Sequence, residues 1–453
     1  MELTLILEMI TASVIGAVLY TIIGIAPGTD ETAVLAPVTL VLVLSGFEPI
    51  VILAFFISAI VAKKLTDSIP VAIAGIPGGV MSAPMVEHAM VLKKHGMPEV
   101  SIRKMASGSV IGTFIAVPMS LLLANLIIPL ADVITQYSNQ IFLGGAIFLA
   151  LMSKNRWVSL LSIIPFAFLI QGLRIAYWET GIVPEDVTVF TSFFLGITIG
   201  PVILKLAELL SGKVRRQLPR YGLKEIVLKK TKTEKGFPNP FKILDRKEIG
   251  TTSFSSILGV LTFFMSPVGM TIFLGETLTS RIKDPVKKAT RAISSMDGLT
   301  NAAYISGTLI PLIAIGLPLS PTAIGPGGAL FNAPPVFTPE NNIHHMLSTG
   351  DFIVATVIGA FVAITITFYV TIKYAQQICA FVFRYVPHEA MLGLFFGLVI
   401  MLAFMDAGIV NVAGVLVVAL VAGFLHRRGV NYGVQFMTLY AAPWLISVFI
   451  PGL

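Results

Sequence analysis

A proline-containing motif occurs twice in the chain, each time inside an apolar stretch. The motif Ile-Pro-x-x-x-x-Gly-[Ile/Leu]-Pro begins at Ile69 and again at Ile310, so the two copies lie 241 residues apart (310 − 69). Proline removes a backbone N–H and glycine loosens a helix, so each copy leaves backbone groups that need partners outside the regular helix. Broken apolar segments at corresponding positions of two halves are typical of transporters, where they form the binding site.

The composition predicts an all-α polytopic membrane protein. Of the 453 residues, 55% are hydrophobic and only 12% are charged, against roughly 25% charged in ordinary soluble domains. Several long stretches lack Lys and Arg, and each can hold one or more helical spans of ~20 residues. We expect about ten to twelve crossings or part-crossings. The candidate spans are 3–25, 33–62 (as a bent or double pass), 106–131, 139–153, 157–177, 188–210, 253–275, 299–317, 351–373, 391–407, 409–426 and 433–451.

A basic segment divides the chain near its middle. Residues 213–247 contain twelve Lys and Arg residues, three acids and three prolines. Basic loops are retained on the cytoplasmic side of a membrane, where anionic lipid attracts them. No recognition motif for nucleic acid accompanies the charge, so we expect no nucleic-acid partner. The chain is therefore divided into a first membrane half over 1–210, a basic cytoplasmic linker over 211–250 and a second membrane half over 251–453.

The charges that flank the two motifs are reversed. In the first half a basic loop with Lys93, Lys94 and Arg103 follows the motif, whereas in the second half the basic segment 281–291 precedes it and 332–350 has no Lys or Arg. If basic loops are cytoplasmic, the two equivalent segments enter the membrane from opposite sides. This predicts two inverted-topology halves with a site near the bilayer midplane, the alternative being a chance difference between two loops.

Small and polar residues around both motifs are the candidate ligand-binding groups. A helix that restarts after a break presents free N–H groups suited to a carboxylate, while the carbonyl groups of the preceding half-helix can hold Na⁺. Glycine lets the backbone approach a ligand, although kinks and tight helix packing alone would also explain these glycines and prolines. The predicted substrate-binding residues are Thr66, Ser68, Pro77, Gly78, Gly79, Ser82, Thr300, Asn301, Pro318, Ser320 and Thr322.

The predicted coupling-ion residues are Asp67 and three residues of a polar break after the first span, Gly28, Thr29 and Asp30. A simple extracytoplasmic turn would also explain that break. Charges inside apolar segments are costly and usually functional. Lys63 lies one helical turn before Asp67, which predicts either an i,i+4 ion pair or a cation or proton site at Asp67, with Lys63 or the adjacent lysine attracting an anion.

Three further acids have two interpretations each. Asp406 is a second candidate proton carrier, or part of an interhelical turn with Gly408 and Asn411. Glu276 and Asp297 border the basic segment 281–291, and we expect both on the solvated surface.

Several ordered motifs resemble those of the large membrane subunit of tripartite tricarboxylate transporters. They are Gly24-x-x-Pro27-Gly28, Pro37-Val38-Thr39, Ile76-Pro77-Gly78, the loop from Met90 to Gly96, and Asn301-Ala302-Ala303 with the proline motif that follows it. The resemblance covers most of the chain outside the linker. It implies a secondary transporter of the cytoplasmic (inner) membrane, which imports small carboxylates such as citrate together with a smaller membrane subunit and an extracytoplasmic solute-binding protein, driven by an ion gradient.

The chain departs from the pattern of that family at its candidate site. It has Lys63-Lys64-Leu65-Thr66-Asp67-Ser68 where the family is glycine-rich, Leu319 where the family has glycine, and two carboxylates after Thr29 where the family is apolar or small. These departures leave open which carboxylate is carried, whether the partner subunits are required, and whether the chain forms a homodimer.

A passive anion channel and a non-transporting membrane scaffold are the alternatives to a carboxylate transporter. A channel predicts a continuous polar path with rings of charge. Histidines with metal spacing, a phosphate loop and a nucleophile elbow are all missing from the sequence, and the single cysteine, Cys379, leaves no thiolate cluster for a metal. We therefore expect neither an enzyme nor a cofactor, with Na⁺ and H⁺ as the candidate coupling ions.

A site between two broken segments must be exposed to the two sides of the membrane in turn. We expect an elevator-like movement of the structural group that carries both segments, with the span 351–373 in the framework.

Overall fold

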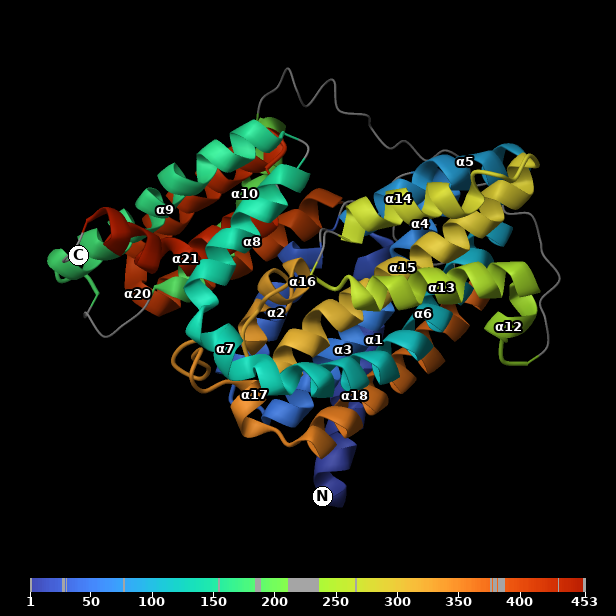
Figure 1. Cartoon of the computed structure of the whole chain (residues 1–453), viewed down its shortest axis with the longest axis horizontal. Coiled ribbons are helices and arrows are strands. Elements are labelled where there is room, and N and C mark those ends of the chain that lie inside the picture. Colours follow the sequence, from blue (N-terminus) through green and yellow to red (C-terminus); the bar gives the residue numbers. More distant parts are fainter. Residues whose placement is uncertain are drawn as a thin grey trace.

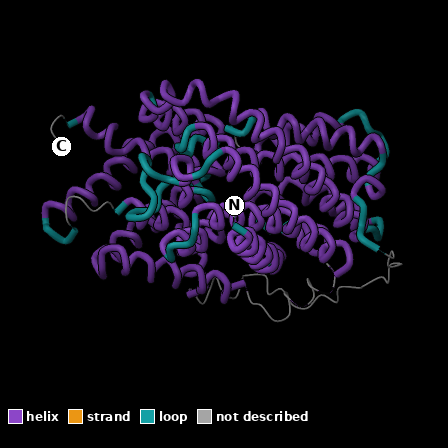
Figure 2. Tube along the Cα trace, turned by 90° about the horizontal axis from the view of Figure 1, so that it is seen from below, coloured by secondary structure: helices purple, strands orange, loops and turns teal. Residues whose placement is uncertain are grey.

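The computed structural model of the chain describes residues 2–26, 29, 31–75, 78–153, 155–183, 189–210, 236–264, 267–374, 377, 381, 388–430 and 432–450. Most of the basic linker, 211–235, lies outside these residues, as do the predicted site residues Gly28, Asp30 and Pro77. The described residues form helices and turns, without a β-strand (Figure 2).

The helices up to the linker are α1 (Leu3–Ile25), α2 (Glu31–Leu44), α3 (Pro49–Thr66), α4 (Ser68–Ala74), the 3-10 helix η1 (Val80–Met85), α5 (Val86–Lys94), α6 (Pro98–Ile127), η2 (Ile128–Leu130), α7 (Ala131–Gln136), α8 (Ser138–Met152), α9 (Arg156–Glu179) and α10 (Phe190–Leu210). Those after it are α12 (Pro240–Ile243), α13 (Arg246–Leu261), α14 (Pro267–Thr279), α15 (Pro285–Ala314), α16 (Pro321–Ile324), η3 (Gly328–Leu330), α17 (Ile343–Met346), α18 (Thr349–Ala363), the π-helix η4 (Ile364–Phe368), α20 (His388–Arg427) and α21 (Tyr432–Phe449).

The helices have the length and surface of membrane spans. Within the described residues six helices are long and apolar enough to cross a bilayer, and four shorter apolar helices accompany them. Large apolar side chains point outward from several of them, among them Leu126 of α6, Leu161 of α9 and Phe361 of α18. Such a surface suits lipid rather than water. The chain is therefore an all-α polytopic membrane protein, as its composition predicts.

The predicted span 33–62 is two helices rather than one. α2 ends at Leu44 and α3 begins at Pro49, a residue that fits the first turn of a helix because the N–H it lacks would have no partner there. α20 also contains a break, at Ala407 and Gly408, where Gly408 has φ 70°. Asn411 donates from Nδ2 to the Ala403 carbonyl at 2.9 Å across this break, which favours the interhelical turn. A proton-carrying role for Asp406 stays a prediction.

The helices form two bundles, each of which contains helices from both sides of the linker (Figure 1). In one bundle α6 packs along α15, while α18 packs along α3. In the other, α10 packs along α20, and α21 packs against α8 and α9. The pairs α6 with α15, α3 with α18 and α10 with α20 thus join the two sides of the linker, whereas α1 with α3 and α13 with α15 pack within one side. The two halves are interleaved rather than placed side by side as separate domains.

The two helices that carry the duplicated motif lie at the centre of the first bundle. In the span that contains α3 and α4, 94% of the residues of the most apolar 18-residue stretch are buried. Every residue of α15 from Ala292 to Ala314 is buried as well. In the most apolar stretch of the span that contains α6, only 17% of the residues are buried. The duplicated motif therefore lies in the protein interior, shielded from lipid by surrounding helices.

Close contact between α6 and α15 depends on glycine. Gly108 and Gly112 of α6 face the backbone carbonyls of Ser294 and Gly298 of α15, and a Cβ at either α6 position would collide with those oxygens. The Gly-x-x-x-Gly spacing puts both glycines on one helix face and lets two backbones approach, as in other membrane helix pairs. The side chains of the two helices can therefore interact at short range.

We predict that Gly112→Ala destabilises the protein, because the added methyl group must push the backbones of α6 and α15 apart. The expected loss is about 1–3 kcal/mol, measured as a lower temperature of thermal unfolding in detergent. Gly144→Ala is the matched control, since a Cβ at Gly144 of α8 meets nothing within 4 Å. Equal unfolding temperatures for the two variants would contradict the proposed packing.

Candidate functional site

The two copies of the motif adopt the same turn. α4 ends at Gly75, with φ 71°, and α15 is followed by Gly316, with φ 73°. In each copy the glycine N–H donates to the carbonyl of the proline five residues earlier, Pro70 in the first and Pro311 in the second. Positive φ is the conformation that glycine adopts without strain. The repeat in the sequence is therefore also a repeat of local structure, in which each motif ends a helix.

The turn after the second motif is held by groups that compensate for the proline. Because Pro311 has no N–H, the carbonyl of Gly307 loses its usual helix partner, and the Ser320 hydroxyl donates to that carbonyl instead. The same hydroxyl accepts the N–H of Ala323 at 3.0 Å and lies 3.2 Å from Thr322 Oγ1. Ser320 therefore fixes the chain after the break. Pro318 and Thr322 are buried beside it.

Two residues outside the predicted site, Asn342 and His344, cap the end of α15. Asn342 donates from Nδ2 to the Gly316 carbonyl at 2.9 Å, and Nδ1 of His344 lies 3.0 Å from the Ile313 carbonyl. Burial and the neighbouring His345 hold the pKa of His344 below its usual range, so the ring is neutral at pH 7. His344 is thus half-buried against the end of α15.

The chain after the first motif folds back over the junction of α3 and α4. A Cβ at Gly78 would collide with the backbone of Asp67, and one at Gly79 would collide with the Glu31 carboxylate. Ser82 donates to the Gly79 carbonyl at 2.9 Å and accepts its N–H at 3.2 Å. Only glycine fits at the two positions, so the backbone approaches these charged residues closely.

The described residues Thr29, Glu31 and Thr32 of the polar break after α1 are buried rather than exposed. Thr29 is 1% exposed and donates to the carbonyls of Ala26 and Gly78 at 2.9 and 3.3 Å. The start of α2 then lies between the two motif segments. Glu31 meets Gly79, and Thr32 meets Gly325 of the segment after the second motif. The first residues of α2 therefore connect the two segments.

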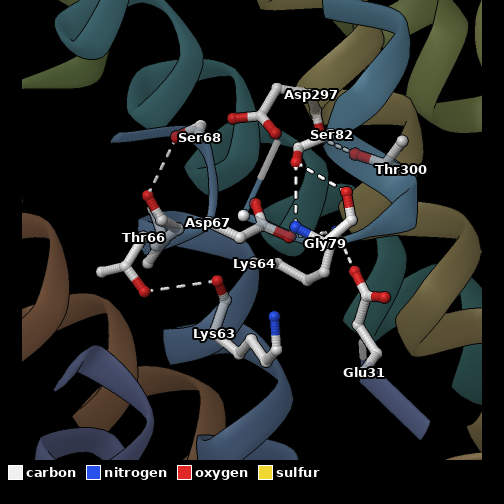
Figure 3. A network of polar contacts seen from close by, with 12 residues as sticks. Glu31, Lys63, Lys64, Thr66, Asp67, Ser68, Gly79, Ser82, Asp297 and Thr300 are labelled. Atoms are coloured by element: carbon white, nitrogen blue, oxygen red, sulfur yellow. Dashed lines mark hydrogen bonds and ion pairs between the residues drawn. The ribbon is translucent and has the colours of Figure 1, made fainter. Parts of the chain in front are cut away.

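Five charged side chains gather where these segments meet, and we call them the charge cluster: Glu31, Lys63, Lys64, Asp67 and Asp297 (Figure 3). All are buried, with at most 4% of any residue exposed. Lys64 Nζ lies 2.8 Å from Asp67 Oδ2 and 3.3 Å from Glu31 Oε1. The same ammonium group lies 5.8 Å from the centre of the Tyr304 ring of α15. Lys64 therefore links α2, α3 and α15.

The cluster differs from the sequence expectation in two ways. Asp67 pairs with Lys64, three residues before it, and not with Lys63. Within the described part of the chain, the Lys63 ammonium and Asp67 Oδ1 are buried without a hydrogen-bond partner. The expectation that Asp297 lies on the solvated surface is wrong, since it is 0% exposed. Glu276 is half-exposed, with Oε1 2.8 Å from His88 and Oε2 3.2 Å from Lys288.

The predicted polar residues near the cluster are engaged with backbone. Asn301 donates from Nδ2 to the Ser109 carbonyl and to Thr113 Oγ1, both at 2.7 Å, and thereby joins α15 to α6. The hydroxyls of three other residues bond within their own helical turns: Thr66 to the Ala62 carbonyl at 2.9 Å, Ser68 to the Leu65 carbonyl at 3.3 Å, and Thr300 to the Asp297 carbonyl at 3.0 Å. Substrate contacts by these side chains stay a prediction.

We predict that Lys64→Met strongly destabilises the protein, because Glu31 and Asp67 would be left buried without their shared cation. Removing one partner of a buried ion pair costs about 3–5 kcal/mol. Thermal unfolding in detergent and the yield of monodisperse protein measure the loss. Adding Glu31→Gln and Asp67→Asn to Lys64→Met should restore most of the stability. Lys63→Met is the matched control, and a Lys64→Met protein as stable as that control would contradict this role.

The chain was compared with known proteins. Residues 10–435 match the family described as tripartite tricarboxylate transporter TctA family. No curated protein and no solved structure matches the chain. The family match spans both motif segments, all five residues of the charge cluster and the helices around them. The chain is therefore a member of the TctA family of tripartite tricarboxylate transporters.

Proposed function

We propose that this chain carries small carboxylate anions of the di- and tricarboxylate type across the membrane, by secondary active transport coupled to Na⁺ or H⁺. The observation that carries the proposal is the Lys63 ammonium, which is buried without a hydrogen-bond partner at the junction of α3 and α4. A buried ammonium group that lacks a partner is costly. A carboxylate of the substrate would supply that partner.

The substrate is proposed to bind between the two motif segments. On the first segment, Gly78 and Gly79 leave room for backbone contact with an anion, and Ser82, Thr66 and Ser68 add hydroxyl groups. On the second, Thr300 and Asn301 precede the break, while Pro318, Ser320 and Thr322 follow it. The position of α2 supports this arrangement, because Glu31 and Thr32 at its start touch one segment each. The sequence predicted the coupling ion at Gly28, Thr29, Asp30 and Asp67; of these, Asp67 is paired with Lys64 and is not proposed as a cation ligand.

An inverted repeat would explain how the helices pair. Shifting the numbering by 241 residues places α1 on α13, α3 with α4 on α15, and α6 on α18 with η4. The contacts follow the same correspondence. The contact between α1 and α3 corresponds to that between α13 and α15, and the contact between α3 and α18 corresponds to that between α15 and α6. Exchange of partners across a pseudo-two-fold axis in the membrane plane is expected of such folds.

The two bundles suggest which parts move. Both motif segments belong to the bundle of α3 and α15, so an elevator-like step would carry that bundle past the one formed by α8, α9, α10, α20 and α21. α18 packs along α3 and belongs to the proposed moving group. The proposed moving group therefore includes the span 351–373, which the sequence had predicted in the framework.

The family description also bears on partners and location. We propose that the chain works in the cytoplasmic membrane with a smaller membrane subunit and an extracytoplasmic solute-binding protein that delivers the carboxylate. The basic linker would lie at the cytoplasmic lipid surface.

The test is uptake of radiolabelled di- and tricarboxylates into proteoliposomes, with and without the candidate partner subunits and with imposed Na⁺ or H⁺ gradients. Lys63→Gln should raise the half-saturating substrate concentration about tenfold or more, because it removes a charge-assisted contact worth about 1.5–3 kcal/mol. Lys94→Gln, on the exposed end of α5, should leave it unchanged. Equal kinetics for a folded Lys63→Gln protein and the wild type would contradict this substrate site.

A further inference from the structure

Among the residues that the structure describes, none forms a hydrogen bond with the carboxylate of Asp297 on α15. It is 0% exposed, and neither Oδ1 nor Oδ2 has a partner (Figure 3). The Ser109 hydroxyl of α6 lies next to it without meeting hydrogen-bond geometry. Asp297 precedes Gly298, whose carbonyl touches Gly112 at the closest approach of the two helices. An ionised carboxylate at such a position is strongly disfavoured unless a positive charge neutralises it.

The charges of the cluster do not balance. The carboxylates of Glu31, Asp67 and Asp297 face the two ammonium groups of Lys63 and Lys64, which leaves one negative charge in excess when all are ionised. Lys64 bonds to Glu31 and Asp67, and Lys63 acts electrostatically on the same two acids. Among the described charges Lys64 attracts Asp297 and Asp67 repels it, but neither is hydrogen-bonded to its carboxylate. The excess charge therefore resides at Asp297, and one monovalent cation would neutralise it.

The groups around Asp297 offer oxygen atoms. Asn301 lies one helical turn further along α15, on the same face. Its amide N–H groups are held by the Ser109 carbonyl and Thr113 Oγ1, which leaves Oδ1 buried without a partner. Ser109 Oγ and Asp67 Oδ1 are likewise buried without a partner. Oxygen atoms of carboxylate, amide and hydroxyl groups are the ligands of hard cations, and they also accept hydrogen bonds from a protonated carboxyl group.

We propose that Asp297 binds the single monovalent cation, Na⁺ or a proton, that neutralises the charge cluster, with Asn301 Oδ1 and the Ser109 hydroxyl as its neighbouring oxygen ligands. Asp67, which the sequence had favoured as the coupling-ion residue, instead forms the fixed ion pair with Lys64. The inference rests on the proposed function for its use in transport. The cation site itself is tested without transport.

The experiment is thermal unfolding of the purified protein in detergent, in NaCl or choline chloride at matched ionic strength and from mildly acidic to mildly alkaline pH. If the cation is Na⁺, NaCl should raise the unfolding temperature of the wild type, and Asp297→Asn should raise the half-maximal Na⁺ concentration about tenfold or more. If it is a proton, the wild type should lose stability as pH rises, because deprotonation leaves a buried unpaired charge. Asp297→Asn should remove that loss, since an amide is neutral at every pH.

Asp67→Asn is the control that separates the two acids. It should retain the cation dependence of the wild type, because Lys64 keeps Glu31 as a partner. Retention of that dependence in Asp297→Asn and its loss in Asp67→Asn would overturn the inference. So would a wild type whose stability responds to neither Na⁺ nor pH. If Asp297→Asn does not fold, Ser109→Ala replaces it: weaker Na⁺ or pH dependence supports the site, and unchanged dependence overturns it.

Several other ionisable groups on the elements around α15 form ion pairs of their own within the described chain. Lys104 pairs with Glu248, and Glu276 with His88 and Lys288. Their contribution to the pH profile is common to the wild type and both variants, so the comparison removes it.

Failure of the proposed function gives a different pattern: the Asp297-dependent stabilisation would be present, while proteoliposomes would take up no carboxylate.

Discussion

Burial of the Lys64 ammonium with two carboxylates is the interaction on which the centre of this protein depends. Lys64 contacts Asp67 at the α3–α4 junction and Glu31 at the start of α2. The chain after the first motif fits over these groups only because Gly78 and Gly79 have no side chains. Desolvating three charges is costly, and mutual pairing offsets much of that cost. The position of α2 against both motif segments follows from this ion pair.

Close packing of α6 against α15 positions the polar residues of α15 at the candidate site. Gly108 and Gly112 let α6 approach α15 closely, and at that distance Asn301 can reach the Ser109 carbonyl. The same approach buries Asp297. Two opposite requirements thus meet on α15, a tight apolar contact and a carboxylate without a partner. The buried carboxylate of Asp297 lowers the stability of this tightly packed contact, and a small apolar side chain would fit there at lower cost. Its presence is therefore more easily explained by ligand binding than by folding.

Local features of the fold could be predicted from the sequence, and long-range contacts could not. The motif predicted two helix ends, and both occur, because proline and glycine act within a few residues. The span 3–25 was also predicted with its observed bounds, since it is apolar throughout. The partner of Asp67 was predicted as Lys63 instead of Lys64, because helix spacing allows both i,i+3 and i,i+4 pairs. The pair with Lys64 goes together with a second bond from Lys64 to Glu31, which lies 33 residues away in the sequence (64 − 31).

Asp297 was misplaced for a similar reason. It lies six residues after Arg291, and six residues of helix span roughly 9 Å. That length carries the chain from the basic segment into the interior between α6 and α3, and no local pattern shows which helices surround it. The Asn342 cap on α15 was missed because it returns from a loop 26 residues later. Family membership rests on a match over 10–435, whereas the proposed ligand-binding residues rest on the geometry of the charge cluster.

The most direct test of the charge cluster as the transport site is a cryo-electron microscopy structure of the protein in a lipid nanodisc with citrate and Na⁺ present. Binding at the cluster predicts density for a carboxylate beside the Lys63 ammonium, between Gly78–Ser82 and the segment after Gly316. Density for citrate elsewhere in the protein, with Lys63 and Asp297 still buried without a ligand, would contradict it.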